Sequence, residues 1–146
     1  LDYALSNGIN TFDTAKAYGC SEKILGEYFK NKKRDSFKIA TKLETTENME
    51  KEISESLENL QLDYVDYYLF HDGPMMNEEN AVENLYKLKE KGYAKKIGVS
   101  VYSPEEALNA VNCSVFDCIQ IPYNVIDKRL DKSGFFEKAI KSNKRH

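Results

Sequence analysis

The chain has 146 residues, of which 41% are hydrophobic and 31% are charged, and its formal net charge is −3. This composition predicts one globular core, and the weak negative charge argues against nucleic acid as a partner. The apolar runs fall well short of the roughly 20 residues that a membrane span needs. The three cysteines lack metal-ligand spacing, which favours reduced thiols in a cytoplasmic protein over a disulfide framework or a metal site.

In chain order, the first part of the sequence predicts three helices with two strands between them. The helices are expected at 1–7, 21–30 and about 48–60, and the strands at 9–12 and 37–41. Asn7 and Gly8 stop the first helix, and Ser21 begins the second. The helical side chains expected to face the core are Ile24, Leu25, Tyr28, Phe29, Met49, Ile53, Leu57 and Leu60.

The second part of the sequence continues the same alternation. Strands are expected at 65–70, 96–101 and 118–121, and helices at about 78–91, from 104 onward and at 135–141. Gly92 ends the helix before the fourth strand. Ser103 and Glu106 form a capping box, with Pro104 at the first helical position.

Because strands and helices alternate, every strand must be joined to the next by a crossover, which predicts a parallel sheet covered by helices. Polar residues close four successive strands at equal intervals of 29 residues, namely Asp13, Lys42, His71 and Ser100. Each interval is one strand-plus-helix unit. We therefore expect these four side chains at one end of the sheet, the end where barrel enzymes have their active sites.

The stretch 8–26 carries the most specific motif, Gly-Ile-Asn-Thr-Phe-Asp-Thr-Ala-Lys-Ala-Tyr-Gly-Cys-Ser-Glu-Lys-Ile-Leu-Gly. It places the carboxylate of Asp13 at the end of a strand and the phenol of Tyr18 in the loop that follows. This stretch resembles the signature of the aldo-keto reductases, and the resemblance continues to about residue 127. It implies a (β/α)8 barrel that reduces carbonyl compounds with a nicotinamide cofactor.

The resemblance also implies that Asp13, Tyr18, Lys42 and His71 form a catalytic tetrad, and their chemistry suits it. A phenol holds its proton tightly near neutrality, but a nearby Lys42 ammonium would help Tyr18 to act as the acid. Asp13 would be the counter-ion of that buried amine, and His71 would hydrogen-bond to the carbonyl. Taken singly, the four residues also fit a turn cap, a surface tyrosine, a lysine that reaches solvent and a loop histidine.

For the cofactor, the resemblance points to Ser100 and Gln120 as the residues that hold the nicotinamide amide. Val101 follows the serine where the family commonly has asparagine, which puts one hydrogen bond to that amide in doubt. The cofactor is expected to be NADP or NAD, with NADPH favoured by the resemblance alone. Ser100 also fits a hydroxyl that satisfies a backbone group, and Tyr123 and Asn124 fit turn residues.

The expected substrate is a small-molecule aldehyde or ketone. Candidates to line its side of the pocket are Leu43, Tyr102, Pro74, Met75 and Met76. The two methionines fit equally well as packing under a loop. The sequence has no tryptophan, so this chain supplies no indole to the pocket, and it leaves the oligomeric state open.

A full barrel takes about 250 residues, so residues 1–146 are expected to form a single partial barrel domain of about five parallel strands. Barrels usually bind phosphate with the loops after the seventh and eighth strands. We therefore expect the isolated chain to be inactive and to bind NADPH weakly. Two alternatives to a reductase remain: a cofactor-binding regulatory subunit with little turnover, and a gene remnant without function.

Overall fold

The computed structural model describes residues 1–142, and these contain one five-stranded parallel sheet in the order β1-β2-β3-β4-β5. The strands are β1 (Thr11–Asp13), β2 (Lys38–Leu43), β3 (Val65–Phe70), β4 (Ala94–Ser100) and β5 (Cys118–Gln120). Every neighbouring pair is parallel, so the chain returns to the same end of the sheet before each strand. The predicted parallel sheet with sequential strands is confirmed.

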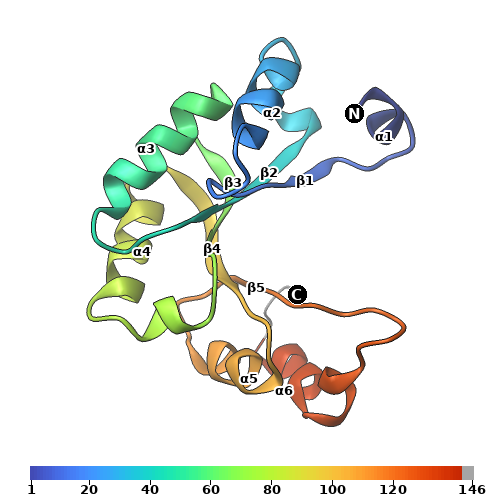
Figure 1. Ribbon diagram of the computed structural model, residues 1–146, viewed down its shortest axis with the longest axis vertical. Coiled ribbons are helices and arrows are strands. Elements are labelled where there is room, and N and C mark those ends of the chain that lie inside the picture. The colour runs from blue at the N-terminus through green and yellow to red at the C-terminus, as the bar shows by residue number, and fades with distance from the viewer. Residues whose placement is uncertain (143–146) are drawn as a thin grey trace.

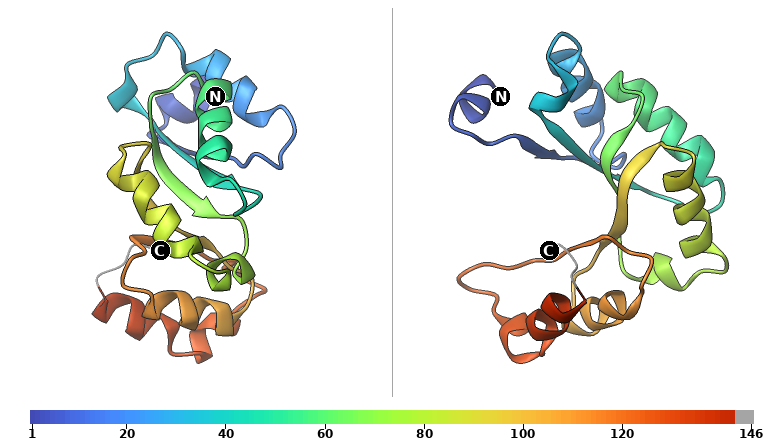
Figure 2. Two further views of the ribbon diagram at one scale, coloured as in Figure 1. Left: turned by 90° about the vertical axis from the view of Figure 1, so that its left-hand side faces the viewer. Right: turned by 180° about the vertical axis from the view of Figure 1, so that it is seen from behind.

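The helices lie on the outer side of a strongly curved sheet, which gives the chain the shape of half a barrel (Figures 1 and 2). They are α1 (Asp2–Ser6), α2 (Ser21–Phe29), α3 (Met49–Leu60), α4 (Ala81–Glu90), α5 (Pro104–Asn112) and α6 (Phe135–Lys141). A 3-10 turn, Pro74–Asn77, precedes α4. In the part of the chain that the structure describes, no helix is long and apolar enough to cross a membrane.

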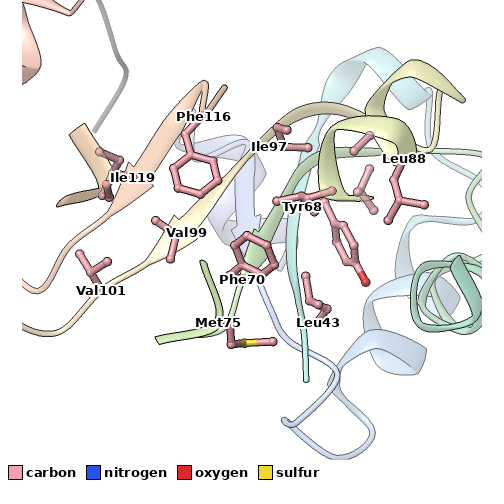
Figure 3. Packing of buried hydrophobic residues seen from close by; sticks show 14 of the residues in the cluster. Leu43, Tyr68, Phe70, Met75, Leu88, Ile97, Val99, Val101, Phe116 and Ile119 are labelled. Atoms are coloured by element: carbon pink, nitrogen blue, oxygen red, sulfur yellow. The ribbon is translucent and has the colours of Figure 1, made fainter. Parts of the chain in front are cut away.

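The hydrophobic core fills the space between the sheet and its helices (Figure 3). Alternate strand residues point into it, because side chains on a strand alternate between the two faces. The buried strand side chains on this face include Ile39, Leu43, Tyr68, Phe70, Ile97, Val99 and Ile119. All four members of the predicted apolar stripe of α3 are buried as well. The other face of the sheet is therefore left for the remaining, more polar half of the strand residues.

Two expectations for the first third of the chain are wrong. The first strand does not begin at Ile9, whose side chain is exposed, but at Thr11, and it includes Asp13. On α2, Ile24 is exposed and Glu22 is buried instead. Glu22 accepts hydrogen bonds from Thr41 at 2.7 Å and from Asn59 at 3.2 Å. These bonds compensate a buried carboxylate, and apolar periodicity carries no signal for them.

Removing the capping box of α5 is expected to cost about 1 kcal/mol of unfolding free energy, the usual value for an N-cap serine. The Ser103 hydroxyl accepts from the Glu106 amide at 3.2 Å, and the Glu106 carboxylate accepts in return from the Ser103 amide. Urea unfolding of Ser103→Ala measures this loss. Ser54→Ala is the matched control, because that hydroxyl lies on the exposed face of α3 and bonds a carbonyl of its own helix. Equal stability of the two variants would contradict the prediction.

Candidate active site

Asp13 and Lys42 form an ion pair at the carboxyl ends of β1 and β2. The Lys42 ammonium donates to both carboxylate oxygens of Asp13, at 2.8 and 2.7 Å, and to the Thr14 carbonyl at 3.0 Å. Lys42 is 2% exposed, whereas the Asp13 side chain is 41% exposed. The amine is therefore enclosed and fully hydrogen-bonded, while its counter-ion still faces the open side of the site.

Tyr18 and His71 lie beside this ion pair. The Lys42 nitrogen is 5.2 Å from the centre of the Tyr18 ring. The imidazole of His71, which directly follows β3, meets the same ring edge-on with 5.8 Å between ring centres. Tyr18 is 48% exposed, so solvent reaches it from the loop side. The four residues predicted from three strand ends and one loop thus lie together.

Ser100 and Gln120 occupy paired positions at the ends of β4 and β5. Ser100 is 5% exposed. The side-chain nitrogen of Gln120 donates to Asp13 at 3.1 Å, and its side-chain oxygen is buried without a hydrogen-bond partner. The curvature of the sheet therefore brings the last strand back to the first. The four predicted strand-end residues lie at the same end of the half-barrel, as expected, and Tyr18 and Gln120 contact this group.

The concave face of the sheet carries an open hollow of about 330 Å³, which two of these residues, Asp13 and Gln120, help to line. Its lining comes from four strands and consists of Thr11, Asp13, Ala40, Tyr67, Leu69, Cys118, Ile119 and Gln120. Burial raises the pKa of the Cys118 thiol to about 12, so this side chain is a neutral packing group. Within residues 1–142, no group of three or more His, Cys, Asp or Glu side chains could hold a metal ion.

The residues suggested for the substrate side differ in burial, and Pro74 is exposed at the start of the 3-10 turn. Leu43 and Met75 are buried in the core between sheet and helices, so the suggestion that they line the substrate pocket is wrong (Figure 3). Met76 is partly buried against the same core. Met75 therefore fits the alternative interpretation, in which the methionines pack under a loop. Tyr102 is 54% exposed next to the end of β4, so it remains a candidate for the substrate side of the pocket.

One element of the site was not predicted from the sequence. Lys16, two residues before Tyr18, donates to Glu52 and Glu55 of α3, each at 2.5 Å. A signal for this contact was present, because Glu52 and Glu55 are three residues apart and therefore share one face of a helix. What the sequence does not give is that this face of α3 meets the loop after β1.

Comparison with known proteins gives one consistent family. The Aldo/keto reductase family model matches residues 1–145. Aldo-keto reductase YhdN of Bacillus subtilis is 34% identical, with 89% of this chain and 44% of YhdN covered. An aldo/keto reductase structure from Brucella melitensis is 30% identical with a TM-score of 0.77, and the alignment covers 97% of this chain and 57% of that one.

A second solved structure extends the likeness in fold. It is an aldo-keto reductase from Klebsiella pneumoniae in complex with NADPH, 22% identical with a TM-score of 0.82, and the alignment covers 99% of this chain and 53% of that one. The chain thus spans about half the length of the relatives it matches. The family match over nearly all its residues and the identity to YhdN show that this chain belongs to the aldo/keto reductase family.

Proposed function

We propose that the full-length protein reduces a small aldehyde or ketone to an alcohol, with hydride from a nicotinamide cofactor and a proton from Tyr18. The observation that carries this proposal is the contact group around Lys42. Its ammonium is held by both oxygens of Asp13 and lies 5.2 Å from the Tyr18 ring centre. A positive charge at that position stabilises the phenolate that remains after proton transfer.

The other tetrad residues divide the work by their chemistry. Asp13 fixes the Lys42 ammonium and compensates its burial. His71, edge-on to the Tyr18 ring, is near enough to share a substrate oxygen with the phenol. An imidazole N–H donated to that oxygen would polarise the carbonyl and orient it toward the acid. In this scheme the proton leaves the Tyr18 hydroxyl, and the alcohol oxygen receives it.

The residues at the ends of β4 and β5 fit a nicotinamide amide. The buried side-chain oxygen of Gln120 has no partner within the chain, so it is free to accept from an amide N–H. Ser100, at the paired position of β4, offers a hydroxyl that can donate to the amide carbonyl. When bound, the cofactor supplies the hydride. NADPH is favoured because the Klebsiella pneumoniae relative is a complex with it.

The location proposed for the protein is the cytoplasm. Cys20 and Cys118 are free thiols. Free thiols in a chain of this size fit a reducing compartment, where disulfides are rare. The proposal is tested by fractionating cells that express the tagged full-length protein.

The activity is tested by incubating the full-length protein with NADPH or NADH and a panel of aldehydes and ketones. We expect cofactor oxidation that depends on the carbonyl compound, with kcat in the range of about 1–10³ s⁻¹ that is typical of enzymes. Product identification by chromatography shows whether the alcohol forms in equal amount. Tight cofactor binding without turnover on any carbonyl would contradict the proposal and favour a regulatory subunit.

A further inference from the structure

The loop that carries Tyr18, residues 14–20, is fixed to its neighbours on two sides. On the main chain, the Thr14 amide donates to Ala40 at 2.8 Å and the Lys16 amide donates to Lys42 at 3.2 Å, which extends the pairing of β1 with β2. The Thr14 hydroxyl donates to Ser21, at the start of α2, at 2.8 Å. Position 16 is thus attached to the strand that supplies Lys42.

The side chain of Lys16 attaches the same loop to α3. Its ammonium lies between the carboxylates of Glu52 and Glu55, 2.5 Å from an oxygen of each. The Lys16 side chain is only 18% exposed and that of Glu52 only 12%. Burial acts to lower the pKa of Lys16, but the hydrogen bonds to the two glutamates and their negative charges together outweigh it and leave the pKa above its usual value. The amine is therefore charged and held.

Glu52 also reaches the other side of the site. Its second oxygen accepts from the Glu44 amide at 3.1 Å. Glu44 is two residues after Lys42, and Lys16 is two residues before Tyr18. The Glu52 carboxylate therefore joins two segments, the loop that carries Tyr18 and the segment that follows Lys42. Such a bond holds more firmly than an exposed ion pair, because the groups are shielded from water.

We propose that Lys16, clamped between Glu52 and Glu55, is a positioning residue that sets the placement of the Tyr18 phenol against the Lys42 ammonium. This inference rests on the proposed function. Lys16 belongs to the tyrosine loop, and its ammonium is held by the two glutamates of α3. It supplies no group to the reaction itself and acts through the placement of Tyr18. A displaced phenol would lose both the stabilising charge and its alignment with the carbonyl.

The test uses the full-length protein with Lys16→Met, which keeps the apolar stem and removes the charge. We expect kcat to fall about 10-fold, because a misplaced catalytic group loses alignment, while the dissociation constant of the cofactor stays the same. Lys16→Arg keeps the charge and should restore most of kcat. The matched control is Lys51→Met, since Lys51 pairs with the same Glu55 at 3.7 Å but is 70% exposed and lies on α3 itself. Its kcat should stay within about twofold of the natural protein.

A second measurement reports how firmly the loop is held and does not depend on catalysis. Amide hydrogen exchange at residues 16–18 should be faster in Lys16→Met than in Lys51→Met, because the clamp no longer holds the loop. Equal exchange in the two variants, or equal kcat, would overturn the inference.

A double variant tests whether the two residues act together. In a Tyr18→Phe background, Lys16→Met should lower the residual kcat much less than it does in the natural protein, since both changes act on one group. A full, additive loss there would overturn it too, whereas full turnover of Tyr18→Phe alone would instead overturn the proposed function.

Discussion

Replacing Tyr18 with phenylalanine is expected to lower kcat for carbonyl reduction by about 100-fold or more, the usual contribution of a general acid. The substitution removes a single oxygen and keeps the ring. The edge-on contact with His71 and the approach of Lys42 to the ring are therefore retained. Only the transferable proton is lost. Cofactor binding should be unchanged, because Ser100 and Gln120 lie on other strands.

The measurement compares steady-state kcat and the cofactor dissociation constant of Tyr18→Phe with those of the natural full-length protein. Tyr86→Phe is the matched control, because Tyr86 is 41% exposed against 48% for Tyr18 and lies on α4 on the outer side of the barrel. It should retain full activity. If Tyr18→Phe turned over as fast as its control, another group would have to supply the proton and the proposed role of Tyr18 would be wrong.

Gly98→Ala is expected to lower the free energy of unfolding by about 3 kcal/mol, the upper part of the range for overpacked sites. Gly98 on β4 pairs with Cys118 on β5. A Cβ at position 98 would lie 1.9 Å from the Cys118 carbonyl oxygen and 3.0 Å from its sulfur. Main-chain atoms cannot turn aside as a side chain does, so the two strands would have to separate.

Urea unfolding of the full-length protein measures this loss. Gly134→Ala is the comparison, since Gly134 has a φ of 76° and no neighbouring atom within 4 Å of the added Cβ. It should lose about 1–2 kcal/mol, the cost of a left-handed conformation for a residue with a Cβ. Separation of β4 from β5 also moves Ser100 away from Gln120, so Gly98→Ala should bind NADPH more weakly. Unfolding at the same urea concentration as the natural protein would refute the clash.

The sequence was most informative where a local pattern and the fold agree. The bounds of β3 were predicted as observed, because a six-residue run rich in aromatic residues between turn residues is too short for a helix. The capping box at Ser103 was also found from its residues alone. Ile24 was misjudged because apolar periodicity carries no signal for a buried carboxylate, and on α2 Glu22 is buried instead. Leu43 was misjudged because the apolar pattern does not say which face of the sheet a residue joins. Position 43 alternates from Lys42 and therefore points into the helix layer.

Contacts between segments that lie far apart in the chain could not be predicted from the sequence. The hydrogen bond from Gln120 to Asp13 joins residues 107 positions apart, and it depends on how far the sheet curls. The clamp at Lys16 depends on where α3 passes the loop after β1. Both are set by packing angles that accumulate over several elements. The residue types of the site could thus be read from the chain, but the way they are held in place required coordinates.

The equal spacing of Asp13, Lys42, His71 and Ser100 has a consequence for how this scaffold can change. Each strand-and-helix module places one of these four residues at the same end of the sheet. A length change in the rear turn of a module is absorbed before the next strand begins. Exchange of one module between relatives would then replace the residue at one strand end and leave the other three in place, which makes the architecture suited to stepwise recombination.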